Sequence, residues 1–526
     1  MFSFLVKKLN HILKSSKRPD ESNNTEDAPK LISKSLLSNV EMMKKILGES
    51  SDIKYHDFLF GDKSQYAGLL VYIEGLADSK VITEGILTPI LVHKNELFSE
   101  GEEMSIGSLK RTIICSGDIL ESGLQNEVVN ACLSGKIVMF IEGAERALLI
   151  SAKGWETRAV SEPQTESVVR GPREGFTENI RTNTSLIRRK IKSPLLRMEH
   201  MTLGKKTSTA INILYLEGVA KDEVLQILRQ RLKNIDVDSI LDAGYIEEYI
   251  EDDPRSIFST VGYSEKPDVI AAKMLEGRIA IVVDGSPFVL TVPMLFIESF
   301  QTAEDYYVRP FYASLVRFLR LIAYLLSIFT VPTFITLTTY HQEFIPTTLL
   351  FTIANAREGT PFPVLIEALI MVFSFEILRE AGLRLPRPVG QSISIVGALV
   401  MGDAAVAAGL VGAPIVIMVA LSAVAGFTIP TQADSISIIR VAMMLIAAFL
   451  GGFGLAMGFI IMLIHLGKIK SFGVHYFGGL APDYNQQDNF IRLSLLSMKK
   501  RPMNIVGEDV IRRGEINNEQ DTGSGQ

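Results

Sequence analysis

The sequence predicts a multidomain integral membrane protein: a duplicated α/β cytoplasmic domain, then an α-helical transmembrane bundle of four or five hydrophobic segments, then a short polar C-terminal region. Three observations predict this fold class. The mean hydropathy of the 526 residues is +0.24, which is high for a soluble chain. Charge is sparse along one late stretch, and two sequence blocks that precede this stretch each occur twice.

Charged residues are distributed unevenly. The 157 residues of 311–467 hold 14 charged side chains, whereas the other 369 residues hold 98. No lysine occurs between Lys273 and Lys468. We therefore expect a transmembrane region at 311–467 and a C-terminal cytoplasmic tail at 468–526.

The N-terminus lacks the pattern of a secretory signal. Residues 1–30 combine a short basic amphipathic segment with a polar, disordered linker. The amphipathic segment is either a helix resting on an anionic membrane face or a frayed terminal helix. We expect the region before the membrane to stay in the cytoplasm, where Cys115 and Cys132 are reduced thiols.

Two blocks recur at a spacing of 142 to 143 residues. LVYIEGLA at 70–77 corresponds to ILYLEGVA at 213–220, and GKIVMFIEGA at 135–144 corresponds to GRIAIVVDGS at 277–286. Each block contains a β-rich run that ends in an acidic residue and glycine, which is typical of a strand and a turn.

The repeats divide the cytoplasmic region into two α/β subdomains. The first is expected at 31–165, with an N-terminal helix and an insertion of about 20 residues at 91–110. The second is expected at 208–310. Between them lies a charged connector at 166–207.

The connector allows two interpretations. It is either an interaction surface for a neighbouring subunit or lipid headgroups, or a solvated hinge between the duplicated units. The basic residues of the predicted surface are Arg170, Arg173, Arg188 and Arg189.

Composition and motifs exclude several functions. Two cysteines cannot frame a secreted domain, and a net charge of −6 gives no reason to expect nucleic acid. The sequence has no phosphate loop, no paired histidines at metal-ligand spacing and no nucleophile elbow. We therefore expect no enzyme, no cofactor and no metal.

The transmembrane region contains several hydrophobic segments. Proline and charged residues make 344–363 a loop or a re-entrant segment rather than a lipid-exposed span. Five crossings would place the tail outside, but its basic residues favour the cytoplasm, so one segment is expected not to cross. The other segments are 321–338, 362–385, 392–412, 414–430 and 441–466, the last being one tilted span or a hairpin broken at its glycines.

Segment 362–385 carries intramembrane charges. Ionised side chains at depth are costly, so we expect them to face a bundle interior or to pair with arginines. A short interfacial helix is the alternative. The charges are Glu367, Glu376, Arg379 and Glu380.

Segment 392–412 is the candidate functional helix. Asp403 lies near its middle, and in a ring of subunits it would form a ring of carboxylates like those of cation pores. A hydrogen-bonded aspartate between packed helices is the alternative. The predicted pore-lining face comprises Val396, Leu399, Val400, Asp403, Val406, Ala407 and Leu410. The small residues Ala398, Gly402, Ala405 and Gly409 suit close helix packing.

Long motifs resemble one family. From about Tyr66 to Arg501 the chain is similar to the A subunit of GerA-family spore germinant receptors, and to the paralogous stage V sporulation protein AF. The matching motifs include PQTESVVRGPREGFTENIRTN, ILDAGYIEEYIEDD, REGTPFPVLIEAL, EILREAGLRLPRPVGQSISIVGALVMGDAAVAAG and KRPMN.

The resemblance implies a multi-pass protein of the inner membrane of a bacterial endospore, with its large N-terminal domain in the cytoplasm. It implies a homo-oligomer that assembles with a transporter-like B subunit and a lipoprotein C subunit into a nutrient germinant receptor. The oligomer is expected to be a ligand-gated channel for monovalent cations that triggers germination. The alternatives are an accessory spore membrane protein of the stage V AF type and a non-conducting membrane scaffold.

Overall fold

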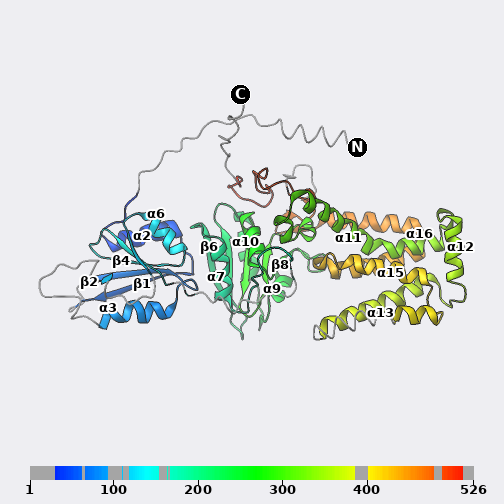
Figure 1. Cartoon of the computed structure of the whole chain (residues 1–526), viewed down its shortest axis with the longest axis horizontal. Coiled ribbons are helices and arrows are strands. Elements are labelled where there is room, and N and C mark those ends of the chain that lie inside the picture. Colours follow the sequence, from blue (N-terminus) through cyan, green and yellow to red (C-terminus); the bar gives the residue numbers. More distant parts are fainter. Residues whose placement is uncertain are drawn as a thin grey trace, which may run out of the picture.

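The computed structural model describes residues 30–61, 66–92, 109–110, 118–152, 154, 163, 166, 168–385, 401–478 and 488–512. Two α/β units and a helical region follow one another along the long axis of the molecule (Figure 1). The amphipathic segment and all but the last residue of the linker predicted at 1–30 lie outside the described residues.

The first unit is built on a five-stranded antiparallel sheet of order β1-β2-β4-β5-β3. Its central strand β4 is a run of apolar residues that are all buried, as in a strand covered on both faces. The strands are β1 (Ile53–Phe60), β2 (Tyr66–Ile73), β3 (Ile119–Ser122), β4 (Ile137–Ile141) and β5 (Ala147–Ile150). The helices are α2 (Leu36–Leu47), η1 (Val81–Leu87), α3 (Thr88–Val92) and α6 (Gln125–Leu133).

The second unit has a five-stranded antiparallel sheet of order β6-β7-β9-β10-β8. Its strands are β6 (Leu196–Leu203), β7 (Thr209–Leu216), β8 (Gly262–Ser264), β9 (Ile279–Val283) and β10 (Val289–Val292). Its helices are α7 (Ile180–Lys190), α8 (Asp222–Lys233), α9 (Ala243–Ile250) and α10 (Pro267–Leu275).

The two sheets share one topology, as the repeated blocks predict. The first block falls on β2 and β7, and the second block falls on β4 and β9. The registers also correspond, because Gly68 pairs with Ile141 in the first sheet and Ile211 pairs with Val283 in the second.

Two predicted details of the duplication are corrected. The second unit begins before residue 208, because α7 and β6 lie within the predicted connector and β6 pairs with β7 along its whole length. Its exposed positions hold polar residues, so β6 lacked the apolar signal of a strand. The first unit has no net insertion, since Ile73 and Ile119 are as far apart in sequence as Leu216 and Gly262.

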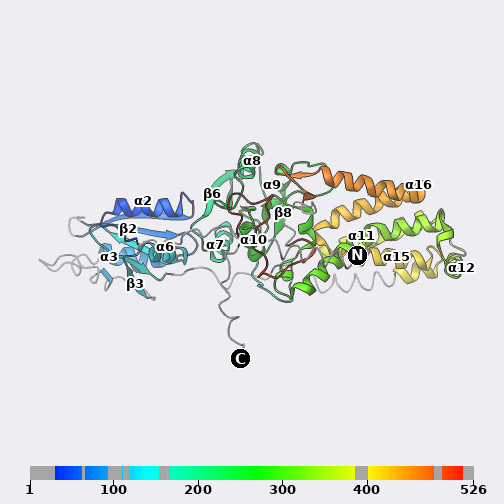
Figure 2. The ribbon, with the colours of Figure 1, turned by 90° about the horizontal axis from the view of Figure 1, so that it is seen from above.

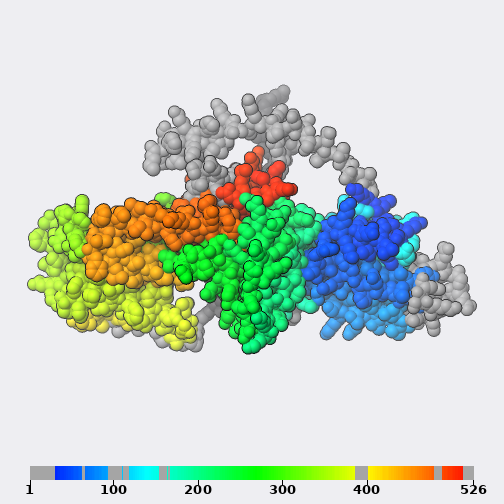
Figure 3. All heavy atoms as spheres, turned by 180° about the vertical axis from the view of Figure 1, so that it is seen from behind, coloured from blue at the N-terminus to red at the C-terminus, as the bar shows by residue number. Residues whose placement is uncertain are grey.

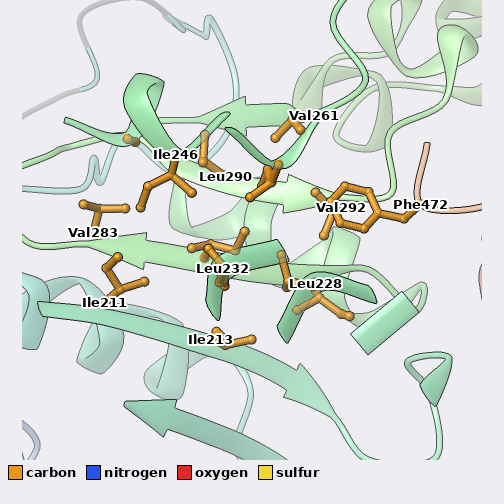
Figure 4. Close-up of a cluster of buried hydrophobic side chains, with 14 of the residues drawn as sticks. Ile211, Ile213, Leu228, Leu232, Ile246, Val261, Val283, Leu290, Val292 and Phe472 are labelled. Carbon is orange, nitrogen blue, oxygen red and sulfur yellow. The ribbon is translucent and has the colours of Figure 1, made fainter. Parts of the chain in front are cut away.

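Helices cover both faces of each sheet. In the second unit, α7 and α10 lie on one face and α8 and α9 on the other (Figure 2). The core on the α8–α9 face includes Leu228, Ile246 and Leu290 (Figure 4). Phe472, which follows the helical region in sequence, adds its ring to this core. Burial of such a side chain contributes about 1.5–3 kcal/mol. In the first unit, α2 and α6 cover one face and η1 and α3 the other.

The helical region is a bundle that begins directly after the second unit. Residues 401–407 are helical, and α11 continues without interruption through Pro332. The other elements are α11 (Pro310–Thr339), η4 (Gln342–Phe344), α12 (Thr347–Ala356), α13 (Val364–Arg384), α15 (Ala413–Gly426), η5 (Pro430–Gln432) and α16 (Ala433–Lys468).

Helix α16 is two helices joined at Gly451, where the backbone has φ 58° and ψ −146°. Glycine adopts this conformation without the clash that a Cβ would bring. The two arms pack on each other, since a Cβ at Gly458 would lie 2.7 Å from the sulfur of Met443. Of the two interpretations of segment 441–466, the structure therefore gives the broken hairpin (Figure 2).

Two helices among the described residues are long and apolar enough to cross a membrane: Pro310–Thr339 and Pro430–Lys468. The predicted number of four or five hydrophobic segments is therefore not confirmed. Helix α15 has 14 residues, and α13 has 21 residues that include several charges.

The chain returns to the second unit after the helical region. A two-stranded ribbon, β11 (Lys470–Ser471) and β12 (Val474–His475), follows α16. Residues 488–512 then lie on the second unit beside the helical region (Figure 3). Aromatic rings from α11, η2 (Phe296–Phe300) and the ribbon form a joint core at this junction; Phe296 lies 5.7 Å from Tyr324 and 5.9 Å from Tyr476. A further short helix, η3 (Ala303–Tyr306), leads into α11.

Candidate functional site

A polar network crosses the interior of the helical bundle. Arg440 of α16 is 3% exposed and binds the carboxylate of Glu376 on α13. Its guanidinium also donates to Ser422 of α15 at 3.3 Å, and Ser422 donates to the carbonyl of Ser327 on α11 at 2.6 Å. One chain of contacts thus connects four helices. Removing one partner of a buried ion pair costs about 3–5 kcal/mol, so the network fixes how these helices pack.

Glu376 of α13 pairs with two arginines. The carboxylate of Glu376 pairs with Arg379 one turn away at 2.6 Å and with Arg440 on a neighbouring helix. Ser437 adds a hydrogen bond of 3.1 Å. The positive groups offset the repulsion expected between Glu376 and Glu380 on one helix face.

Glu367 is a second buried carboxylate of the bundle. It is fully buried in the first turn of α13. Its carboxylate accepts from Arg357 at 2.9 Å and from the backbone N–H of Gly412 at 2.9 Å. Glu367 therefore links the turn after α12 to the start of α15. Glu380, in contrast, is exposed and pairs with Arg384 at 2.6 Å.

The helix that holds Asp403 presents two different faces. Asp403 and Ala407 are exposed in the single chain. Val406 is half-buried and packs against the core between α11, α13 and α15, and Leu410 is exposed but follows the C-terminal end of the helix, so the predicted pore-lining positions of these two residues are corrected. Gly402 is buried, and a Cβ there would lie 3.6 Å from a methyl group of Val416 on α15.

Ala405 packs partly into the core between α11, α13 and α15, so Gly402 and Ala405 lie on the packed side of the helix. The remaining predicted residues of this helix, Val396, Ala398, Leu399 and Val400, lie outside the described part of the chain.

Gly409 ends this helix instead of packing within it. The backbone N–H of Gly409 bonds to the carbonyl of Val406, and the N–H of Leu410 bonds to the carbonyl of Ala405. Gly409 has φ +68°, and this pattern is the Schellman motif of helix C-termini. The predicted packing role of Gly409 is therefore corrected, because small-residue spacing resembles a glycine stop signal in sequence.

Ion pairs fasten the start of α11 to the second unit and to the returning chain. Arg317 is fully buried and binds Asp305 at 2.9 Å and Asp488 at 2.8 Å. Arg320 binds Asp305 at 2.9 Å. Burial raises the pKa of Tyr306 well above its usual value, so its hydroxyl stays protonated and donates to Asp488 at 2.7 Å.

The predicted connector surface divides into exposed and buried residues. Arg170 and Arg173 are exposed, and Arg189 is half-buried and contacts Glu174 at 3.4 Å. Arg188 is 1% exposed and does not belong to a surface. It binds Asp52 of the first unit at 2.9 Å and Ser50 at 3.2 Å.

The interpretation of Arg188 as an interaction residue is therefore corrected: it joins the two units within one chain. A basic run in a sequence does not distinguish the one residue that faces inward from its neighbours that face water.

Arg440, Asp305 and Asp488 are functional candidates that sequence reasoning did not single out. Arg440 carries a usable signal, because it directly precedes an uncharged run of 26 residues, Val441 to Leu466. Asp305 and Asp488 are far apart in sequence, and their common partner Arg317 becomes visible only in the fold.

The fold defines a class of protein: two α/β units of one topology joined to a helical bundle that contains two helices of membrane-spanning length. A family model described as "Bacillus/Clostridium GerA spore germination protein" matches residues 41–504. The chain belongs to this GerA family, and the predicted resemblance is confirmed.

Curated relatives match nearly the whole chain. Spore germination protein KA of Bacillus subtilis (strain 168) is 42% identical, covering 93% of this chain and 90% of that protein. Spore germination protein B1 of the same organism is 37% identical, covering 92% and 99%. The Bacillus subtilis protein named "Uncharacterized membrane protein YfkQ" is 42% identical, covering 92% and 93%.

A solved structure also matches. It is the crystal structure of the N-terminal domain of the A subunit of the Bacillus megaterium spore germinant receptor GerK3, at 34% sequence identity. The match covers 51% of this chain and 99% of that chain, with a TM-score of 0.41.

Proposed function

We propose that this chain is the A subunit of a nutrient germinant receptor in the inner membrane of a bacterial endospore. In this proposal it oligomerises into a ligand-gated channel for monovalent cations, and a transporter-like B subunit and a lipoprotein C subunit complete the receptor. The relatives named as spore germination proteins support the role in germination. The proposal assigns the chain no catalytic step and no cofactor.

The exposed carboxylate of Asp403 carries the channel proposal. Glu367 and Glu376 of the same bundle are paired with arginines, whereas Asp403 has no ion-pair partner among the described residues. Its helix turns Gly402 toward α15 and leaves Asp403 and Ala407 outward. Such a face is available to line an axis shared by several copies, where carboxylates attract cations.

The path of the chain supports placing both α/β units and the described C-terminal residues on one side of the membrane, which the proposal takes as the cytoplasmic side. Residues 470–478 and 488–512 pack on the second unit, which supports a helical region that begins and ends on one side and crosses an even number of times. The hairpin of α16 provides two passes, and its first arm, 433–450, is about 27 Å long. This length approaches the hydrocarbon thickness of a bilayer, about 30 Å.

Asp403→Ala tests the proposal in the full-length chain reconstituted into liposomes together with its B and C partners. We expect the oligomer to persist and germinant-triggered rubidium flux to fall at least about tenfold, because each copy loses a cation-attracting charge. Glu343→Gln, in the exposed turn after α11, is the matched control and should conduct normally.

Normal flux through the Asp403→Ala oligomer would argue against a pore at this face. Flux that is absent even from the unsubstituted chain, together with normal germination of spores carrying Asp403→Ala, would favour the scaffold or the stage V AF type.

A further inference from the structure

The α9 face of the second unit is acidic and carries exposed aromatic rings. Residues 234–254 hold eight acidic residues and no basic one; Asp236, Asp238 and Asp252 pair with Lys205, Lys206 and Arg231. On α9, Tyr245, Glu248 and Tyr249 lie on the exposed side, with exposed fractions of 44% for Tyr245 and 52% for Tyr249. Leu241, just before α9, is 61% exposed. We call Leu241, Tyr245, Glu248, Tyr249 and Asp253 the acidic face.

The connector side of the same unit is basic. Residues 168–192 hold seven basic residues and two acidic ones. Arg170 and Lys192 are exposed, and neither takes part in an ion pair within the described part of the chain. Val169, beside Arg170, is 87% exposed. We call Val169, Arg170, Arg173 and Lys192 the basic face.

The two faces lie on opposite sides of one sheet. Phe176 of the connector packs with α7 and α10, whereas α9 packs with α8 on the other side of the sheet. Figure 2 shows α8 and α9 above the strands and α7 and α10 below them. The second unit lies between the first unit and the helical bundle along the long axis of the molecule (Figure 1). Copies arranged side by side in one membrane would bring such faces together.

We propose that the second α/β unit is a head-to-tail interface between copies of this chain, in which the acidic face of one copy docks on the basic face of the next. This inference rests on the oligomer of the proposed function and names the surfaces that form it. Contacts between two different faces of identical subunits close into rings when the rotation allows, whereas a two-fold contact would stop at a dimer.

The chemistry of the two faces suits this contact. Tyrosine and arginine are the residues that most often dominate binding energy at protein interfaces, and here one face offers two tyrosines and the other two arginines. Opposite charges at the rim steer association and fix the register. The attraction between exposed charges is screened by salt, with a Debye length of about 8 Å at physiological ionic strength.

Exchanging the charges of the two faces tests the inference. The full-length chain is purified in detergent, and the mass of its oligomers is measured by mass photometry at low and high salt. Glu248→Lys and Arg170→Glu should each lower the association constant at least about tenfold, because each places like charges across the contact. The double variant, Glu248→Lys with Arg170→Glu, should restore association to within about threefold, since the pair is exchanged and not lost. Tyr249→Ala should weaken association at both salt concentrations.

Glu41→Lys, an exposed carboxylate on α2 of the first unit, is the matched control and should leave association unchanged. If the chain oligomerises but neither reversal weakens it, the inference is wrong and the proposed oligomer stands. If the unsubstituted chain is monomeric under every condition, the proposed oligomer itself is wrong. Single variants that weaken association without rescue in the double variant would also overturn the pairing of these two faces.

Discussion

The two α/β units have one topology but complete it differently. In the first unit, the turn after β2 is covered by the chain that follows β5, and the backbone N–H of Gly154 bonds to the carbonyl of Leu76. In the second unit, the C-terminal segment takes this place. The backbone N–H of Gly507 bonds to the carbonyl of Val219, which corresponds to Leu76. The first unit is therefore completed locally, whereas the second is completed by residues that return from beyond the helical region.

The starts of helices α6 and α10 differ in the same way. In the first unit, Ser122 donates to Glu127 of the same unit at 2.6 Å. In the second, the corresponding Ser264 donates to Glu166 of the connector at 2.8 Å. Asp268 of α10 accepts from Tyr307, just before α11, at 2.6 Å. The second unit is thus the place where connector, bundle and C-terminal segment meet.

Deletion of residues 505–526 should have the largest effect, and it should act on the second unit alone. It removes the buried side chains of Ile505 and Val506, each worth about 1.5–3 kcal/mol, and the backbone bonds of Gly507. We expect hydrogen exchange of the full chain in detergent to accelerate around 218–220, while the first unit keeps its protection. Equal loss of protection in both units would contradict local completion of the first.

Arg188→Met should separate the two units by removing the buried guanidinium and leaving Asp52 unpaired. We expect a loss of about 3–5 kcal/mol, which is typical of a broken buried ion pair. Calorimetry should then resolve a separate transition for the first unit. Arg181→Met is the control: Arg181 pairs with Glu74 but its side chain is 69% exposed, so the cost should stay below about 1 kcal/mol. Equal effects of the two substitutions would show that burial does not decide the strength of this connection.

A matched pair of glycine substitutions gives the smallest expected effect. A Cβ at Gly507 would lie 2.9 Å from the carbonyl of Ala220, and one at Gly154 would overlap Asp78. Valine at either position should cost about 1–3 kcal/mol through overpacking. Gly154→Val should loosen the first unit alone, and Gly507→Val the second alone, as measured by limited proteolysis. If Gly507→Val leaves the second unit as resistant as before, the C-terminal segment does not hold it.

The duplicated elements are predictable from the sequence. The contacts between residues that lie far apart in the sequence are not. The duplication was predictable because buried strands such as β4 and β9 retain apolar runs and their glycine turns. The edge strand β6 was missed because half of its side chains face water or other polar groups.

Within the site, the pairing of Glu376 was predictable in kind, since a buried carboxylate needs a cation, but its partner Arg440 lies 64 residues away. No local pattern in the sequence indicates that residues 505–509 form hydrogen bonds with the turn after β7, at residues 218 and 219. The orientation of Asp403 relative to the axis of the proposed oligomer was not predictable, because it is set by contacts between chains.

The late return of the C-terminal segment has a consequence for biosynthesis. Chains are made from the N-terminus and domains generally fold as units during synthesis, so the first unit has all of its residues early. The second unit must wait until residues 505–509 leave the ribosome, after every helix of the bundle has been made. Its completed state therefore exists only in chains whose helical region has already been translated, and an interrupted polypeptide would expose an unfinished unit to quality control.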